Sequence, residues 1–130
     1  MRAGEVLDVG VREQPQASPA RPGPTAPTAA GGPVETHERL LASIPASVLR
    51  SFRERLLGPL AEYDARHHAE LLPTLRSFLA CDGSWSACAS RMYVHVNTVR
   101  YRIGRIEELT GRDLSALPDR VDFFLALRAA

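Results

Sequence analysis

Arginine carries the chemistry that this sequence offers, and it gathers in one short stretch. Residues 84–112 hold five arginines against two glutamates, which gives this stretch a charge of 5 − 2 = +3, while the remainder of the 130-residue chain carries −2. A guanidinium group can form paired hydrogen bonds with guanine and with phosphate. The net charge of the whole chain, +1, does not by itself indicate a nucleic-acid partner. The local concentration does, and we therefore expect double-stranded DNA to bind here.

Two short helices with a tight turn between them are predicted around these arginines. Ser84 is a suitable N-cap for a helix that runs to about Met92, and Asn97 is a suitable N-cap for a second helix that runs to about 110. Gly111 can close the second helix in a left-handed conformation. The residues of the second helix that recur at the helical period, and that we expect to face the core, are Val99, Ile103, Ile106 and Thr110. The opposite face is then free to contact another molecule.

A helix pair of this kind can place its second helix in the major groove of DNA, with the first helix crossing the backbone. We expect residues 97–110 to be the groove helix. The side chains expected to reach base edges and nearby phosphates are Asn97, Thr98, Tyr101 and Arg105. The side chains expected near the phosphate backbone are Ser84, Ser86, Arg91, Arg100 and Arg102, with His95 in the turn. Alternatively, Arg100 and Arg105 only form a solvated face. In that case Arg105 pairs with Glu107 or Glu108.

The rest of the chain predicts further helices and no strand, because no stretch shows sustained alternation of apolar and polar residues. We expect a helix over 45–57 and a new one beginning at 58–59, where a proline suits a first turn. A helix over 70–81 should end at the Asp-Gly pair 82–83, and a C-terminal helix beginning near Pro118 should fold back over the others. The fold class expected is therefore all-α, a small helical bundle.

Composition divides the chain into three segments. Six of the ten prolines lie before Val34 in a run of Ala, Gly, Thr and Ser, so we expect 1–34 to be a disordered tail. Residues 35–66 are expected to form a helical linker or dimer helix. Residues 67–130 are expected to form the helix-turn-helix domain.

Several classes of function find no support in the sequence. No apolar run is long enough to span a bilayer, and the first residues lack the apolar region of a secretory signal, so we expect a cytoplasmic, nucleoid-associated protein without a membrane partner. Cys81 and Cys88 are too few for a disulfide framework and fit reduced core thiols. His67, His68 and His95 do not stand at metal-ligand spacing, so no metal is expected. No enzyme motif is recognised and no cofactor is expected.

The segment NTVRYRIGRIEELTGRDL (97–114), preceded by VHV and followed by DRVDFFLALR (119–128), resembles the C-terminal DNA-binding domain of PucR/CdaR-like bacterial transcriptional regulators. Members of that family control purine or sugar-diacid catabolism. The resemblance implies a Fis-like helix-turn-helix that is the output of a larger regulator, whose N-terminal part senses a metabolite. Residues 34–60 look like the end of the upstream region, so the chain is similar to a truncated or stand-alone member without the sensor.

One position departs from the family pattern. Gly104 stands where many relatives carry arginine, which removes one phosphate contact and lowers helix stability by about 1 kcal/mol relative to alanine.

The function expected is that of a sequence-specific DNA-binding transcriptional regulator. We expect a homodimer, or a heteromer with full-length relatives, and no small-molecule effector in this chain. The alternative is a helical protein–protein interaction or dimerisation module that does not bind DNA by itself. A steep loss of affinity with salt would distinguish the DNA complex from this alternative.

Overall fold

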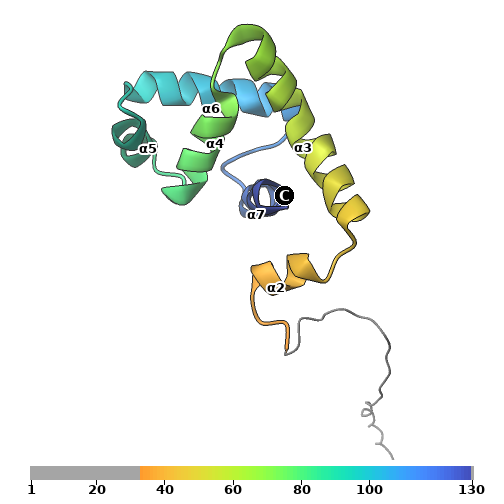
Figure 1. The fold of residues 1–130 in the computed structure, drawn as a ribbon. Coiled ribbons are helices and arrows are strands. Elements are labelled where there is room, and N and C mark those ends of the chain that lie inside the picture. Colours follow the sequence, from red (N-terminus) through yellow and green to blue (C-terminus); the bar gives the residue numbers. More distant parts are fainter. Residues whose placement is uncertain (1–32, 130) are drawn as a thin grey trace, which may run out of the picture. The chain divides into compact units, whose positions relative to one another are not determined.

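The computed structural model describes residues 33–129, which form six helices and no strand (Figure 1). The expected all-α fold is confirmed for this part of the chain. The chain divides into two units, Met1–Ser43 and Ile44–Ala130. The described part of the first unit holds the short helix α2 (His37–Ala42), capped by the Thr36 hydroxyl. Most of the expected disordered tail, 1–34, lies outside the described residues.

Five helices form the second unit. They are α3 (Ala46–His67), α4 (Leu71–Ala80), α5 (Trp85–Met92), α6 (Val96–Thr110) and α7 (Leu117–Arg128). Helix α6 packs against α3, α4 and α5, while α7 packs against α3 and α4 (Figure 1). None of the helices described is long and apolar enough to cross a bilayer. The expected helix over 70–81 and the expected C-terminal helix are confirmed.

One continuous core fills the space between these helices. Its buried side chains are Leu56, Leu57, Leu60, Leu71, Leu75, Phe78, Cys88, Ala89, Val99, Ile103, Ile106, Leu114, Phe123 and Ala126. Cys88 is a free thiol inside the core and Cys81 a free, half-buried thiol at the end of α4, as expected. The expected stripe on α6 faces this core, although Thr110 is only half-buried.

The predicted helix break at 58–59 is wrong. Helix α3 runs through Pro59 without interruption for 22 residues. Proline lacks an N–H and so costs the helix one hydrogen bond. Leu57 before Pro59 and Leu60 after it are both buried, and a continuous helix keeps them on the face that meets the core. This packing outweighs the lost hydrogen bond.

The end of α3 also fixes the start of α4. The Asp64 carboxylate accepts hydrogen bonds from the backbone N–H groups of Leu71 at 2.7 Å and Leu72 at 2.9 Å. Free N–H groups at a helix start need such an acceptor. The intervening His68 and Glu70 take left-handed backbone conformations, with φ of 52° and 58°, which turn the chain sharply.

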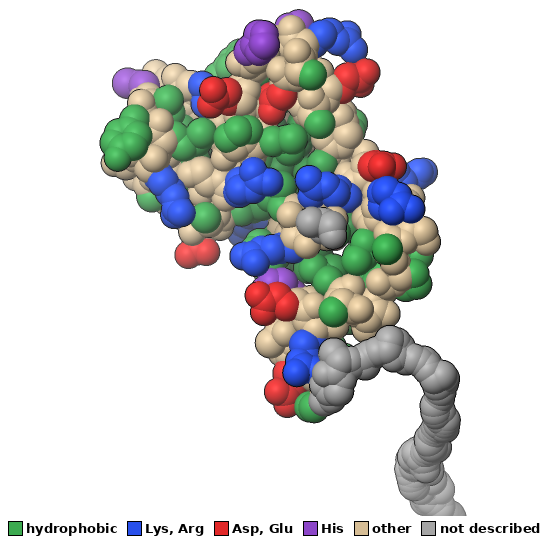
Figure 2. All heavy atoms as spheres, viewed as in Figure 1, with side chains coloured by type: hydrophobic (Ala, Val, Ile, Leu, Met, Phe, Trp, Pro, Cys, Tyr) green, Lys and Arg blue, Asp and Glu red, His purple; other side chains and the backbone are tan. Residues whose placement is uncertain are grey.

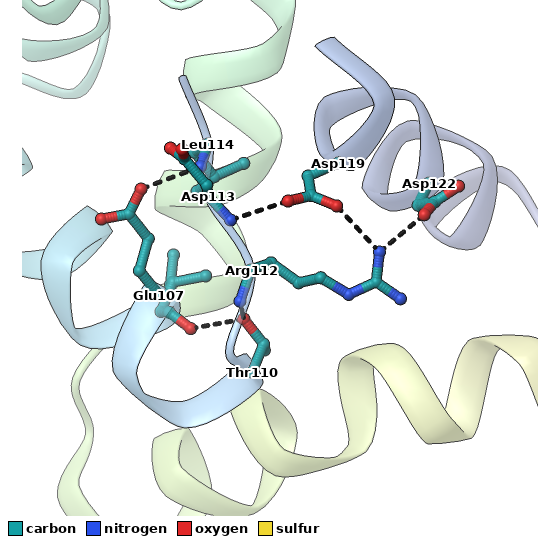
Figure 3. A network of polar contacts seen from close by, with 8 residues as sticks. Glu107, Thr110, Arg112, Asp113, Leu114, Asp119 and Asp122 are labelled. Carbon is teal, nitrogen blue, oxygen red and sulfur yellow. Dashed lines mark hydrogen bonds and ion pairs between the residues drawn. The ribbon is translucent and has the colours of Figure 1, made fainter. Parts of the chain in front are cut away.

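A polar network joins the end of α6 to the start of α7 (Figure 3). Arg112 Nη1 lies 3.1 Å from Asp119 Oδ1 and 2.6 Å from Asp122 Oδ2, and the hydrogen bond to Asp122 is the main cause that raises the pKa of Arg112. Glu107 Oε2 accepts a hydrogen bond from the Leu114 N–H at 2.8 Å. Two of the charges counted in the 84–112 stretch, Arg112 and Glu107, therefore serve the fold.

Candidate nucleic-acid interface

Helices α5 and α6, joined by residues 93–95, form the expected helix-turn-helix. The Ser84 hydroxyl accepts a hydrogen bond from the Ala87 N–H at 3.1 Å, so the predicted N-cap of α5 is confirmed. Ala89 is buried at the crossing, and its carbonyl accepts a hydrogen bond from the Val94 N–H at 3.0 Å. A small residue here lets the two helices approach each other closely.

The predicted N-cap of α6 is wrong. His95, not Asn97, caps the helix: its ring nitrogen Nδ1 accepts a hydrogen bond from the Asn97 N–H at 3.0 Å. Histidine is not among the preferred capping residues, whereas asparagine is, so the residue types favoured Asn97. Because the cap lies two residues earlier, the side-chain amide of Asn97 is not used as a cap, and Asn97 is exposed on the first turn of α6. At the other end, Gly111 closes the helix with a φ of 71°, as predicted.

The side chains at the start of α6 are open to solvent. Asn97, Arg100 and Tyr101 are exposed, and Thr98 is half-buried. The Arg100 guanidinium lies over the Trp85 ring at 5.2 Å from its centroid. A cation above an aromatic face is attracted to it, so this contact holds Arg100 against α5 while leaving it accessible.

Arg105 is held by its neighbours. Its Nη1 lies 2.9 Å from Glu108 Oε1, and its Nη2 donates to the Tyr101 hydroxyl at 3.0 Å. The guanidinium also lies 5.6 Å from the centroids of both the Tyr63 and Tyr101 rings. The hydrogen bond to Tyr101 is the main cause that raises the pKa of Arg105. The expected pairing with Glu108 is therefore present, and Arg105 supports Tyr101.

Arg102 faces the fold. It is half-buried, and its Nη1 donates to the Thr74 hydroxyl at 3.1 Å. Thr74 is a buried residue of α4 and donates in turn to the Glu70 carbonyl. This contact ties α6 to α4. The structure does not bring Arg102 to the exposed group of Asn97, Arg100 and Tyr101.

The remaining candidates lie on α5 and the turn. Ser86, Arg91 and His95 are exposed, whereas Ser84 is half-buried and used as a cap. From Ser84 to Ile106 the chain has four arginines and no Asp or Glu. Figure 2 shows basic side chains at intervals across one face of the second unit, not in one compact patch. The site is marked by the absence of carboxylates from the segment 84–106.

Sequence reasoning missed two residues of this region. Trp85 was given no part in the site, but its ring, which lies 5.0 Å from the Phe78 ring between centroids, also supports Arg100. Tyr93, in the turn, was given no role, yet its side chain is 94% exposed. An aromatic residue at the expected position of a turn was the available signal.

The family comparison agrees with this geometry. Residues 71–129 match the PucR C-terminal helix-turn-helix domain. This part of the chain is therefore a helix-turn-helix domain of the PucR type. Such domains are parts of transcriptional regulators and are not enzymes.

Three similar proteins come from different bacteria. The chain is 45% identical over 78 residues to a protein encoded in the 5′ region of pkwA in Thermomonospora curvata, which covers 60% of this chain and 43% of that protein. It is 37% identical to the transcriptional activator PmfR of Paenarthrobacter nicotinovorans, over 66% of this chain and 20% of PmfR. It is 38% identical to the purine catabolism regulatory protein of Bacillus subtilis, over 68% and 17%. The chain thus spans less than half the length of these relatives. No solved structure matches it.

Proposed function

We propose that the second unit binds double-stranded DNA in a sequence-specific manner, as the output domain of a bacterial transcriptional regulator. The observation that carries this proposal is the exposed start of α6, where Asn97, Arg100 and Tyr101 stand on a helix-turn-helix. The segment 84–106, which includes them, contains no Asp or Glu. Helix-turn-helix proteins contact base edges with the first residues of their second helix. The names of PmfR and of the Bacillus subtilis regulator support a role in transcription.

The side chains take different roles in this proposal. Those at the start of α6 that reach base edges are Asn97, Thr98 and Tyr101. Those that contact phosphates are Arg100 from α6, Ser86 and Arg91 from α5, and His95 from the turn. Ser84 acts through its cap, Arg105 by holding Tyr101, and Arg102 by tying α6 to α4. The last two roles replace the direct DNA contacts expected for these arginines.

The cellular location follows from DNA as the partner. A DNA-binding regulator of this bacterial family works in the cytoplasm on the nucleoid. We infer a homodimer, or a heteromer with full-length relatives, because a single small module contacts only one half-site.

A salt titration tests the proposal. Binding of the purified chain to the DNA upstream of its own gene, measured by fluorescence anisotropy, should weaken steeply with salt, with a log–log slope of about −0.9 per phosphate contact. Arg100→Ala should weaken binding to every duplex and make the slope shallower by about 0.9. Arg50→Ala, which removes an exposed arginine near the start of α3, is the charge-matched control and should change neither. A wild-type chain without salt-sensitive binding contradicts the proposal.

A second candidate function is a protein–protein interaction module without autonomous DNA binding. The observation that favours it is the set of exposed apolar side chains on the outer helices: Val48 of α3, and Leu117 and Val121 of α7, are 54%, 63% and 43% exposed. The same titration separates the two functions. Self-association or partner binding that persists at high salt, without any DNA complex, supports the interaction module.

A further inference from the structure

Tyr93 combines two unusual features. Its side chain is 94% exposed, more than any other large apolar side chain of the described residues. Its backbone is left-handed, with φ of 59° and ψ of 43°. It ends α5 and opens the turn that leads into α6.

The fold uses the left-handed backbone to cap α5, but it does not explain why a tyrosine stands there. The left-handed region suits glycine and asparagine, and a tyrosine backbone is strained there. The backbone N–H of Tyr93 caps α5 by donating to the Ser90 carbonyl at 3.2 Å, a contact that glycine or asparagine would also make. The ring buries almost no surface. A less strained residue would therefore serve the free domain better, which points to a role in a complex.

The position of the turn indicates the partner. In a helix-turn-helix complex the first helix crosses the DNA backbone and the start of the second reaches base edges, so the turn lies beside the wall of the groove. The exposed neighbours Arg91 and His95 add no negative charge, and the segment 84–106 has no carboxylate that would repel phosphate. Tyrosine hydroxyls are common donors to phosphate oxygens.

We propose that Tyr93 contacts the sugar–phosphate backbone at the edge of the major groove, with its hydroxyl donating a hydrogen bond to a phosphate oxygen and its ring packing on the adjacent sugar. The contact rests on the proposed function of DNA binding. It offsets the strained turn only in the complex. Because the tyrosine is neutral, the contact adds affinity without releasing a counterion.

The test uses Tyr93→Asn and Tyr93→Phe in the full chain. Asparagine tolerates the left-handed conformation, so the melting temperature of Tyr93→Asn should equal or exceed that of the wild type. Its affinity for a fluorescein-labelled duplex of mixed sequence should fall by about three- to tenfold, the equivalent of one hydrogen bond. The salt slope should stay unchanged, unlike that of Arg100→Ala. Val48→Asn is the control for loss of an exposed apolar side chain and should bind as the wild type does.

The outcomes are distinct. Equal DNA affinity of Tyr93→Asn and the wild type overturns the contact while leaving the proposed function intact. Affinity retained by Tyr93→Phe overturns the hydroxyl–phosphate hydrogen bond. If Tyr93→Asn melts at a lower temperature, Tyr93→Phe, which keeps the ring and the backbone, decides the question. A wild-type chain that shows no salt-sensitive binding overturns this contact and the proposed function together.

Discussion

At the scale of single residues, Tyr101 and Arg105 form one unit. Arg105 donates to the Tyr101 hydroxyl, which uses an oxygen lone pair and leaves the hydroxyl proton free. Tyr101 is therefore set to donate to an acceptor, such as a phosphate oxygen or the N7 of a purine. Arg105 fixes the direction of that donor because Glu108 and two tyrosine rings hold it in place.

This arrangement predicts that the two residues act together in DNA binding. Tyr101→Phe and Arg105→Ala should each weaken binding to the preferred duplex, and the double variant should lose less than the sum. We expect a coupling free energy of about 0.5–3 kcal/mol from a double-mutant cycle of dissociation constants. The pair Tyr101→Phe and Arg91→Ala, which share no contact among those found in the structure, is the control and should be additive. Additive losses for Tyr101 and Arg105 would show that they contact DNA independently.

At the scale of helices, the glycines of the second unit differ in whether the structure would accept a side chain at their position. A Cβ built at Gly104 in α6, or at Gly58 in α3, meets no atom within 4 Å. Gly111 has a left-handed backbone with φ of 71°, where any side chain is strained. The low helix propensity of Gly104 is therefore a cost without a packing reason. Gly58 differs, because it precedes Pro59, whose ring crowds a Cβ on the preceding residue in a helix.

Substitution by alanine should distinguish the glycines inside helices from Gly111, whose backbone is left-handed. Gly104→Ala should raise the free energy of unfolding by about 1 kcal/mol, because alanine loses less backbone entropy in a helix interior. Gly58→Ala should gain less stability than Gly104→Ala, because its Cβ meets the ring of Pro59, and Gly111→Ala should be destabilising. Thermal or urea unfolding followed by circular dichroism measures all three. A destabilised Gly104→Ala would mean that α6 needs the flexibility of glycine.

The helices themselves could largely be predicted from the sequence, because their signals are local. The cap at Ser84, the closing glycine at 111 and the apolar period of α6 all lie within a few residues of the feature they define. Two helix boundaries were predicted wrongly. One depends on contacts between residues far apart in the sequence, and the other on an unusual capping residue. The buried face that carries α3 through Pro59 is a tertiary effect, and the cap at His95 uses a residue that rarely takes this role.

The candidate site was harder to predict than the fold. The sequence places Arg100, Arg102 and Arg105 on one short helix, but their partners lie elsewhere. Arg102 bonds to Thr74 of α4, and Arg105 stacks on Tyr63 of α3. Only the folded chain shows that Arg100 alone of these three has no hydrogen bond or ion pair in the structure. The left-handed backbone of Tyr93 could not be predicted from the sequence, because tyrosine rarely adopts it.

At the scale of the whole molecule, the net charge of +1 conceals an uneven distribution. Carboxylates at the end of α6 and beyond it are engaged within the fold. Asp119 and Asp122 pair with Arg112, and Glu107 accepts a hydrogen bond from the Leu114 N–H. The segment 84–106 is left without a carboxylate. A weakly charged chain can therefore present a locally positive surface to phosphate.

Two copies of the chain should bind one duplex. We expect cooperative binding to a site with two half-sites about one helical turn apart, close to 34 Å between centres. Inserting half a turn, about 5 base pairs, between the half-sites should abolish the cooperativity, and a full turn should restore part of it. Genomic mapping of bound sites followed by gel-shift titration measures this. Binding of single copies with no dependence on spacing would contradict the dimer.

The uninterrupted course of α3 has a mechanical consequence. At 1.5 Å per residue its 22 residues form a rod of about 33 Å that continues through Pro59. The rod packs on α4, α6 and α7, and its Asp64 holds the first turn of α4. We therefore expect a rotation imposed at Ala46 to reach α6, which carries Asn97, Arg100 and Tyr101, and α4, which packs against α6. A break at Pro59 would absorb that rotation before it reached them.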